Sequence, residues 1–322
     1  MENCLYVVVP CYNEEQVIEF TSKELKTKLE FLILNNKISE ESKIVFVNDG
    51  STDNTWNLIK RLNKESNIFL GINLSHNVGH QKALLCGLLT AKKYCDIAIS
   101  IDADLQDDIN AIDQMIEKYL HGCDIVYGVR NNRDSDSFFK KFTAELFYKI
   151  MGFCGIESIF NHADFRLLSK RALVGLSKFK EYNLFLRGII PMIGYESDIV
   201  FYKRTKRVAG KSKYPLNKMI SFALEGITSF SIKPVRMITI IGFIMFLTSI
   251  AMLIYVLIKF FSNQTIVGWS SLMLSVWGTG SMILIAIGVV GEYIGKIYLE
   301  SKHRPKFIIE SILDNDELSN KD

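Results

Sequence analysis

The 322-residue chain lacks several features that would assign it to a common class. Its net charge of +3 is too small to predict nucleic-acid binding by itself. Its six cysteines include no CxxC pair, so we expect free thiols, most of them packed. No GxGxxG motif follows the first predicted strand, which argues against a Rossmann dehydrogenase. The N-terminal residues 1–4 have no basic start, so no signal peptide is predicted.

Charge is also missing from two long stretches near the C-terminus, residues 237–258 and 260–291, which only Lys259 separates. Each stretch exceeds the roughly 20 apolar residues that a bilayer-spanning helix needs. We therefore expect a transmembrane hairpin over 237–295, with helices at about 237–260 and 267–290. Two buried core helices are the alternative, but core helices of this length normally have a polar face.

Basic residues flank this predicted hairpin on both sides, whereas its connecting loop carries no charge. The flanking residues are Lys233, Arg236, Lys296, Lys302, His303, Arg304 and Lys306. The positive-inside rule then places both termini in the cytoplasm. The prediction is a multi-pass protein of the cell inner (plasma) membrane. Residues 296–322 form a cytosolic tail that is expected to fray after Glu310.

Strand and helix patterns alternate through residues 1–215. The predicted strands are Leu5–Val9, Lys43–Val47, Ile68–Ile72, Ile97–Ile101 and Asp124–Gly128. Helical patterns occupy Glu14–Leu34, Thr55–Leu62, Gln81–Lys93 and Ile109–Tyr119. This alternation predicts an α/β fold with a mostly parallel sheet, in which ligands bind beyond the carboxyl ends of the strands.

Residues 216–236 form a separate amphipathic element. Apolar side chains recur there at helical spacing, from Leu216 to Phe230. A core helix would show the same pattern. The position directly before a predicted membrane span favours an interfacial, juxtamembrane helix.

An aspartate pair follows the fourth predicted strand, in the run Asp102-Ala-Asp104-Leu-Gln106. Carboxylates that leave a buried strand are costly unless a cation meets them. Oxygen-ligated Mg²⁺ or Mn²⁺ commonly supplies that charge and bridges to phosphates. The run therefore predicts a nucleotide-diphosphate substrate, and a solvated turn that caps the next helix is the alternative.

Four motifs stand in order after the predicted strands: VPCYNEE at 9–15, VNDGSTD at 47–53, NVGHQKA at 77–83 and DADLQD at 102–107. Together they resemble the family-2 inverting glycosyltransferases of the Rossmann-like GT-A fold. Further motifs at 143–148, 163–167, 185–188 and 204–214 are similar to the polyprenyl-phosphate glycosyltransferases. That group includes dolichyl-phosphate mannose synthases and bactoprenol glucosyltransferases. The resemblance covers about residues 4–300.

The resemblance implies inverting transfer of a single sugar from a nucleotide-sugar to polyprenyl (undecaprenyl) phosphate at the cytosolic membrane face. UDP-glucose is favoured as donor over UDP-GlcNAc, UDP-galactose or GDP-mannose. The implied nucleotide-binding residues are Pro10, Tyr12, Asn13, Glu14, Asp49, Gly79 and Asp102. Asp104 and Gln106 are the implied ligands of Mg²⁺ or Mn²⁺ on the diphosphate, and Asp102, Asp104 and Asp164 form the implied catalytic set.

Asp164 and His80 each keep two interpretations. Asp164 suits a general base, but a lipid monophosphate is already largely dianionic near pH 7 and needs positioning more than deprotonation. Asp164 is equally well explained as a group that orients the sugar or pairs with Arg166. His80 either contacts the ligand or caps the helix that it begins.

Six cations lie within the eleven residues 203–213. A charge run alone usually indicates a solvated face or attraction to anionic lipid. The embedded motif and the resemblance instead favour a loop that closes over phosphate. The candidates for binding the acceptor phosphate are Arg130, Arg204, Arg207 and Lys213.

The chain departs from the resembled pattern at two places. Asp107-Asp-Ile-Asn110 replaces a proline-containing continuation, and Met192 stands where an aromatic residue is common, which leaves the donor open. A processive synthase is disfavoured because two spans are few for an exporting channel and no QxxRW motif is present. A non-catalytic, nucleotide-sugar-binding membrane scaffold remains an alternative, and so does assembly as a homo-oligomer.

Overall fold

The computed structural model describes residues 3–131, 162–181, 185–203, 233–261 and 268–313. They divide into two compact units, which are described separately. The first unit contains the described residues up to 203 together with 304–313, and the second contains the described residues from 233 to 303.

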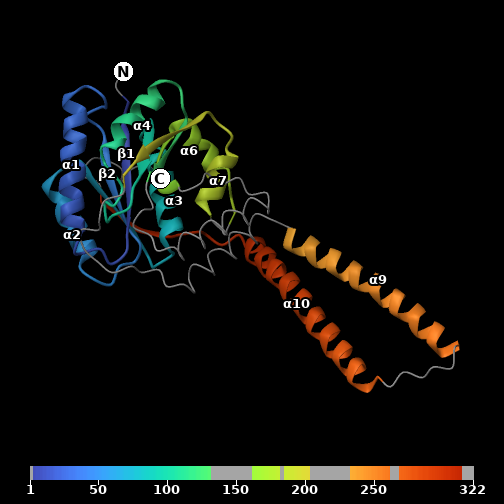
Figure 1. The fold of residues 1–322 in the computed structure, drawn as a ribbon. Helices are drawn as coiled ribbons and strands as arrows, with labels where there is room; N and C mark the ends of the chain where they lie inside the picture. Colours follow the sequence, from blue (N-terminus) through green and yellow to red (C-terminus); the bar gives the residue numbers. More distant parts are fainter. Residues whose placement is uncertain (1–2, 132–161, 182–184, 204–232, 262–267, 314–322) are drawn as a thin grey trace. The chain divides into compact units, whose positions relative to one another are not determined.

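The first unit is built on one eight-stranded sheet with the order β7-β5-β6-β4-β1-β2-β3-β8 (Figure 1). Its strands are β1 (Leu5–Cys11), β2 (Lys43–Asn48), β3 (Phe69–Leu74), β4 (Ile97–Ser100), β5 (Ile125–Arg130), β6 (His162–Ser169), β7 (Ser197–Tyr202) and β8 (Ile309–Leu313). Strands β4, β1, β2 and β3 are parallel neighbours, and β5 pairs in parallel with β7. Strand β6 is antiparallel to β4 and β5, and β8 is antiparallel to β3. The predicted α/β class with a mostly parallel sheet is confirmed.

Helices connect and cover these strands. They are α1 (Ile18–Leu34), α2 (Thr55–Glu65), α3 (His80–Ala91), α4 (Ala111–Leu120), α6 (Lys170–Leu176) and α7 (Leu186–Met192). The first four correspond to the four predicted helices, with ends that differ by up to four residues. Helices α6 and α7 and strands β6 to β8 were not among the predicted elements.

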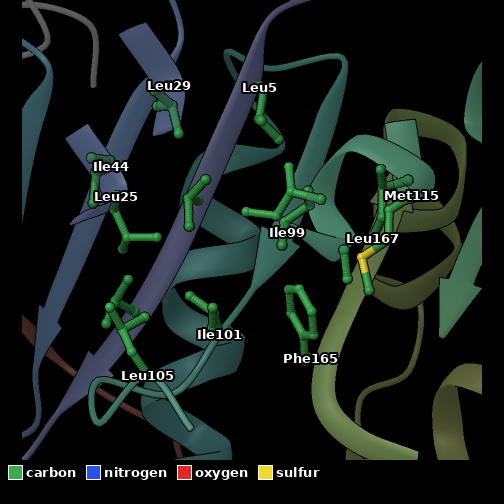
Figure 2. Close-up of a cluster of buried hydrophobic side chains, with 14 of the residues drawn as sticks. Leu5, Leu25, Leu29, Ile44, Ile99, Ile101, Leu105, Met115, Phe165 and Leu167 are labelled. Carbon is green, nitrogen blue, oxygen red and sulfur yellow. The ribbon is translucent and has the colours of Figure 1, made fainter. Parts of the chain in front are cut away.

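The main core lies on one face of the sheet, against α1, α2 and α4. Alternate residues of a strand point to the same face, so Leu5, Val7 and Val9 of β1 all join this core. Figure 2 shows Leu25 and Met115 reaching the same cluster from α1 and α4. The opposite face packs against α3, whose Gly87 allows a close approach. A Cβ there would lie 2.3 Å from Val8 and 2.8 Å from Val47.

The second unit contains two long helices, α9 (Lys233–Phe261) and α10 (Trp269–Ser301). They run antiparallel to each other in Figure 1. Helix α9 contains the predicted span 237–260, and α10 overlaps the predicted span 267–290 but continues to Ser301. Within the described residues, only the 24-residue stretch Gly278–Ser301 has the length and mean hydropathy of a membrane-spanning helix. Membrane crossing by two helices therefore stays a prediction. Most of the predicted juxtamembrane helix, residues 216–232, lies outside the described residues.

The chain that follows α10 returns to the first unit and adds β8 to the sheet. Ser75 N donates to Ile308 O at 3.0 Å, and the side chain of Asn63 donates to Leu313 O at 3.3 Å. The expectation that the chain frays after Glu310 is therefore wrong for residues 311–313. The polar sequence after Glu310 did not predict a strand, but the backbone of this segment pairs with the edge of β3.

Candidate active site

The loops that follow β4, β1, β2 and β3 meet at one edge of the sheet because these strands are parallel. Asn13, after β1, joins the loop after β2. Its N–H donates to Ser51 Oγ at 3.0 Å, and its Oδ1 accepts from Thr52 N at 2.8 Å. Its φ of +54° lies in the left-handed region that asparagine tolerates better than most residues. Asn13 therefore fixes the shape of the edge from which a ligand would be bound.

The other predicted nucleotide contacts on β1 and its loop differ in exposure. Pro10 is buried within β1, whereas the side chain of Tyr12 is 41% exposed at the same edge. Glu14 N donates to Thr55 Oγ1 at 2.9 Å, which holds the start of the loop against α2. Tyr12 therefore presents part of its ring to solvent at this edge.

Asp49 is buried and binds the loop that begins α3. Its Oδ1 accepts from Val78 N at 2.7 Å, and its Oδ2 accepts from Gly79 N at 3.0 Å. Burial raises the pKa of Asp49, and these two N–H donors oppose that rise. Gly79 precedes α3 with a φ of +92°, a conformation that suits glycine. The structure thus brings Asp49 and Gly79 together, but by a direct hydrogen bond rather than through a ligand.

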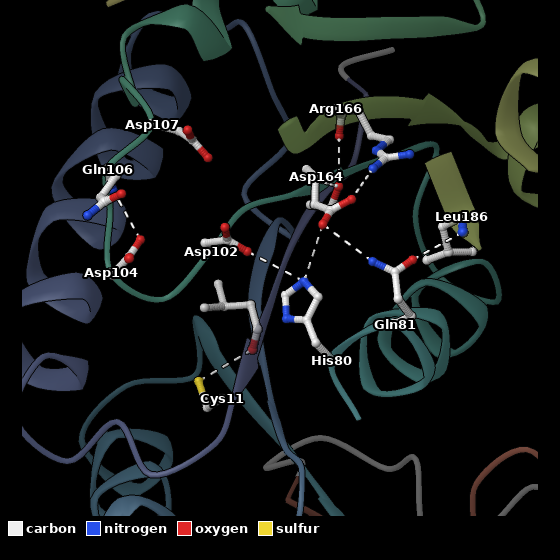
Figure 3. A network of polar contacts seen from close by, with 12 residues as sticks. Cys11, His80, Gln81, Asp102, Asp104, Gln106, Asp107, Asp164, Arg166 and Leu186 are labelled. Carbon is white, nitrogen blue, oxygen red and sulfur yellow. Dashed lines mark hydrogen bonds and ion pairs between the residues drawn. The ribbon is translucent and has the colours of Figure 1, made fainter. Parts of the chain in front are cut away.

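The aspartate run after β4 alternates between the core and the edge of the sheet. Ala103 and Leu105 are buried in the main core, while Asp102 and Asp104, which Figure 3 shows on this loop, are only partly buried. Leu105 has a φ of +43°, which turns the chain so that Gln106 follows close to Asp104. Core packing of two apolar side chains therefore presents the two carboxylates outward.

His80 lies between two carboxylates. Its Nε2 is 3.6 Å from Asp102 Oδ1 and 3.6 Å from Asp164 Oδ2. Burial would lower the pKa of His80, but the two carboxylates raise it to about 9. Burial raises the pKa of Asp102 to about 6. His80 opposes that rise, whereas the carboxylates of Asp107, Asp164 and Asp104 add to it. At neutral pH His80 is therefore the protonated partner of these two carboxylates.

Asp164, on β6, is neutralised by the protein itself. It is paired with Arg166, which is fully buried, and with Arg187, whose Nη2 lies 3.2 Å from Asp164 Oδ2. Gln81 donates to the same Oδ2 at 3.4 Å. Burial would raise the pKa of Asp164, but Arg187, His80 and Arg166 hold it well below its ordinary value. A carboxylate with so low a pKa is a weak general base, so the geometry favours the interpretation that pairs Asp164 with arginine.

A second buried carboxylate connects the aspartate run to the far strands of the sheet. Asp107 Oδ1 accepts from Arg130 Nη2 at 2.9 Å and from the Tyr202 hydroxyl at 2.6 Å. Within the described residues, Asp107 Oδ2 is buried and has no hydrogen-bond partner. Arg130, a predicted ligand of the acceptor phosphate, is thus held beside the aspartate run. The other three candidates, Arg204, Arg207 and Lys213, lie outside the described residues.

Sequence reasoning assigned no role to three residues that the site depends on. Arg187 and Gln81 both contact Asp164, and Tyr202 contacts Asp107 and Arg130. Arg187 and Gln81 lie within motifs at 185–188 and 77–83, which was the available signal. Tyr202 ends a strand that was not predicted, so no signal pointed to it.

Comparison with known proteins gives consistent matches. Residues 6–175 match the model of the family described as "Glycosyl transferase family 2". The chain is 51% identical over 315 residues to the uncharacterized glycosyltransferase YkoT of Bacillus subtilis, covering 98% of this chain and 94% of that protein. It is 42% identical over 310 residues to the bactoprenol glucosyl transferase of Shigella phage SfV, covering 95% and 97% of the two chains. Mannosyl-3-phosphoglycerate synthase from Rubrobacter xylanophilus aligns structurally with a TM-score of 0.48 and 13% identity, covering 69% of this chain and 71% of that one.

Proposed function

The chain belongs to glycosyltransferase family 2, and from this premise we propose that it transfers one sugar from a nucleotide-sugar to polyprenyl phosphate at a membrane surface. The observation that carries the proposal is the position of Asp102 and Asp104 on the loop after β4, at the sheet edge where the loops after β1, β2 and β3 meet. Carboxylates in this position suit a divalent metal ion that is bound together with a nucleoside diphosphate. Several relatives with about 40% identity over nearly the whole chain are named bactoprenol glucosyl transferase, which supports a polyprenyl phosphate acceptor and glucose as the sugar.

UDP-glucose is the donor that we favour. UDP-GlcNAc, UDP-galactose and GDP-mannose remain alternatives, since a few pocket contacts decide between sugars. The residues proposed to bind the nucleotide are Pro10, Tyr12, Asn13, Glu14, Asp49, Gly79 and Asp102. Of these, Asn13 and Asp49 would act mainly by shaping the loops, because Asn13 bonds to the loop after β2 and Asp49 bonds to the loop after β3.

A divalent cation, Mg²⁺ or Mn²⁺, fits the aspartate run. Within the described residues, no three His, Cys, Asp or Glu side chains are grouped closely enough to hold a metal alone. One or two carboxylates suffice, however, when substrate phosphates complete the coordination. Burial raises the pKa of Asp102, His80 opposes that rise, and three other carboxylates add to it, so a bound divalent cation would favour the ionised form. We propose Asp104 and Gln106 as ligands, and the metal would neutralise the nucleoside diphosphate that leaves.

The proposed reaction is a single displacement with inversion. An oxygen of the acceptor phosphate forms a bond to the anomeric carbon, while the bond from that carbon to the diphosphate breaks. The attacking phosphate already carries its charge, so no side chain needs to accept a proton. We therefore assign Asp164 to positioning: it holds Arg187 and His80 at the edge of the site. Arg130 and the segment with Arg204, Arg207 and Lys213 are proposed to bind the acceptor phosphate.

Membrane attachment is proposed through α9 and α10. Apolar side chains along α10 are strongly exposed within the second unit, including Leu284 at 71% and Ile297 at 67%. Such a surface is stable in lipid rather than in water. We propose a two-helix hairpin in the cell inner (plasma) membrane with both termini cytoplasmic and residues 216–236 as a juxtamembrane helix.

The test incubates membranes that contain the full chain with undecaprenyl phosphate, Mg²⁺ or Mn²⁺ and a panel of labelled sugar nucleotides. We expect label from one donor in the lipid extract, with loss of that label when EDTA is added. The scaffold alternative predicts nucleotide binding with no lipid-linked label from any donor. That result, with folded protein, would reject the proposed transfer to this acceptor.

A further inference from the structure

A row of hydrogen-bonded side chains runs from β8 across β3 to the loop after β2. Asn73 Nδ2 donates to Glu310 Oε2 at 2.6 Å, and Asn48 Nδ2 donates to Asn73 Oδ1 at 2.6 Å. Asn48 Oδ1 then accepts from Ser51 N at 3.4 Å. Glu310 is exposed, whereas Asn73 and Asn48 are 9% and 2% exposed. The row thus connects the surface of the last strand to a buried position under the edge of the proposed site.

The carboxylate of Glu310 and the N–H of Ser51, at the two ends of this row, set the same direction for every bond in it. An ionised carboxylate only accepts hydrogen bonds, so it requires the NH₂ group of Asn73 to face it. The oxygen of Asn73 then faces Asn48 and requires its NH₂ group in turn. The oxygen of Asn48 is left pointing toward Ser51 N. The N–H of Ser51 requires the same orientations from the other end of the row, so Glu310 and Ser51 N together fix the Asn73 amide.

The end of the row is the loop that joins three parts of the proposed nucleotide site. Ser51 Oγ accepts from Asn13 N at 3.0 Å. Gly50 lies so close to the next loop that a Cβ would stand 2.5 Å from Asn77 N. Asp49 holds the backbone of Val78 and Gly79. A change in the position of Ser51 is therefore transmitted to the loops after β1 and β3.

We propose that Glu310 is a positioning residue for nucleotide binding, and that β8 is a working part of the donor site. This inference rests on the proposed function, because the loop over residues 48–53 is taken there to bind the nucleotide. It adds a role for the segment that directly follows the α10 helix. The conformation of the loop over residues 48–53 then depends on β8, the strand that follows α10.

The test reverses the polarity of the row. Lysine only donates hydrogen bonds, so Glu310→Lys should turn the amides of Asn73 and Asn48 and set a donor against Ser51 N. We expect binding of UDP with Mg²⁺, measured calorimetrically on the full chain in detergent, to weaken about tenfold. Amide hydrogen exchange over residues 48–53 should become faster. Glu310→Gln can still present an oxygen to Asn73, so its affinity should stay within about twofold of wild type.

Two further variants distinguish an effect of hydrogen-bond direction from a nonspecific disruption of β8. Ser311→Lys places the same charge on the neighbouring exposed position of β8 and should leave both readouts unchanged. Adding Asn73→Asp to Glu310→Lys restores an acceptor toward both neighbours and should recover most of the lost affinity. Equal effects of Glu310→Lys and Ser311→Lys, or no recovery in the double variant, would overturn the proposal.

A second variant and a measurement that does not depend on turnover complete the test. Should Glu310→Lys fail to fold, Glu310→Leu removes the acceptor without adding charge, and unchanged exchange over 48–53 in that variant would overturn the proposal. Failure of the proposed function is a different result, namely no sugar transfer by the wild-type chain. Hydrogen exchange does not depend on turnover, so it tests the role of Glu310 in either case.

Discussion

Asp102 and Asp164 each lie 3.6 Å from the same imidazole nitrogen, Nε2 of His80, yet their surroundings move their pKa values in opposite directions. Asp164 is 8% exposed and is paired with two arginines, so it stays ionised far below neutral pH. Asp102 is 36% exposed and has other carboxylates as neighbours, with His80 as its ion-pair partner.

The difference separates a carboxylate that the protein has already neutralised from one that awaits a ligand. A buried ion pair holds strands and helices in place, and breaking it leaves a charge without compensation. A partly exposed carboxylate beside others costs stability until a cation arrives, which is typical of binding sites. Substitutions in the aspartate run should therefore mainly reduce activity, whereas substitution of Asp164 should mainly reduce stability.

The largest expected effect is a loss of activity when Asp104 of the aspartate run is replaced. Asp104→Asn removes a proposed metal ligand, and sugar transfer should fall at least about 100-fold, while the unfolding midpoint stays within the error of wild type. The measurement is initial transfer rate in membranes together with thermal unfolding in detergent. Asp108→Asn, at a partly buried position of the same loop that is not among the proposed ligands, is the control and should retain activity within about twofold. Equal losses in both variants would contradict a specific role for Asp104.

The next largest expected effect is a loss of stability when Asp164, the carboxylate paired with two arginines, is replaced. Asp164→Asn leaves the fully buried Arg166 without its carboxylate, and the free energy of unfolding should fall by about 3 kcal/mol. Chemical denaturation of the full chain in detergent would measure it. Asp198→Asn removes a surface partner of Lys118 and should cost less than about 1 kcal/mol. A similar, small cost for both changes would show that Asp164 is not the structural partner described here.

Much of this arrangement was predictable, but only where the signal was local. Strands β1 to β5 and the motif at 102–107 could be predicted because each depends on a short run of residues and the turn after it. The pairing of Asp164 with Arg187, and of Asp107 with Arg130, joins segments 23 residues apart through tertiary packing. Strand β8 is short and largely exposed, so the edge of β3 rather than its own pattern determines it. That is also why Glu310 gave no signal as a neighbour of Asn73.

The smallest expected effect is a gain in stability that depends on pH. The folded protein raises the pKa of Asp102 from 3.8 to about 6, so between these values the folded state binds a proton more tightly than the unfolded chain does. The contribution of Asp102 to stability therefore falls as pH rises and is fully unfavourable above about 6. Asp102→Asn removes that cost. In EDTA at pH 7.5 the variant should be more stable than wild type by about 1 kcal/mol, a figure reduced for partial solvent screening.

The same variant provides its own control at low pH. Below about pH 3 Asp102 is protonated in both the folded and unfolded states, so the two proteins should have equal stability there. Sugar transfer by the variant should be low at every pH, since a proposed nucleotide contact is lost. A variant that is less stable than wild type at pH 7.5 would mean that His80 already compensates Asp102 fully. The contrast with Asp164 would then disappear, because both carboxylates would be structural. Asp104 alone would remain as the carboxylate proposed to meet the metal ion and the nucleotide.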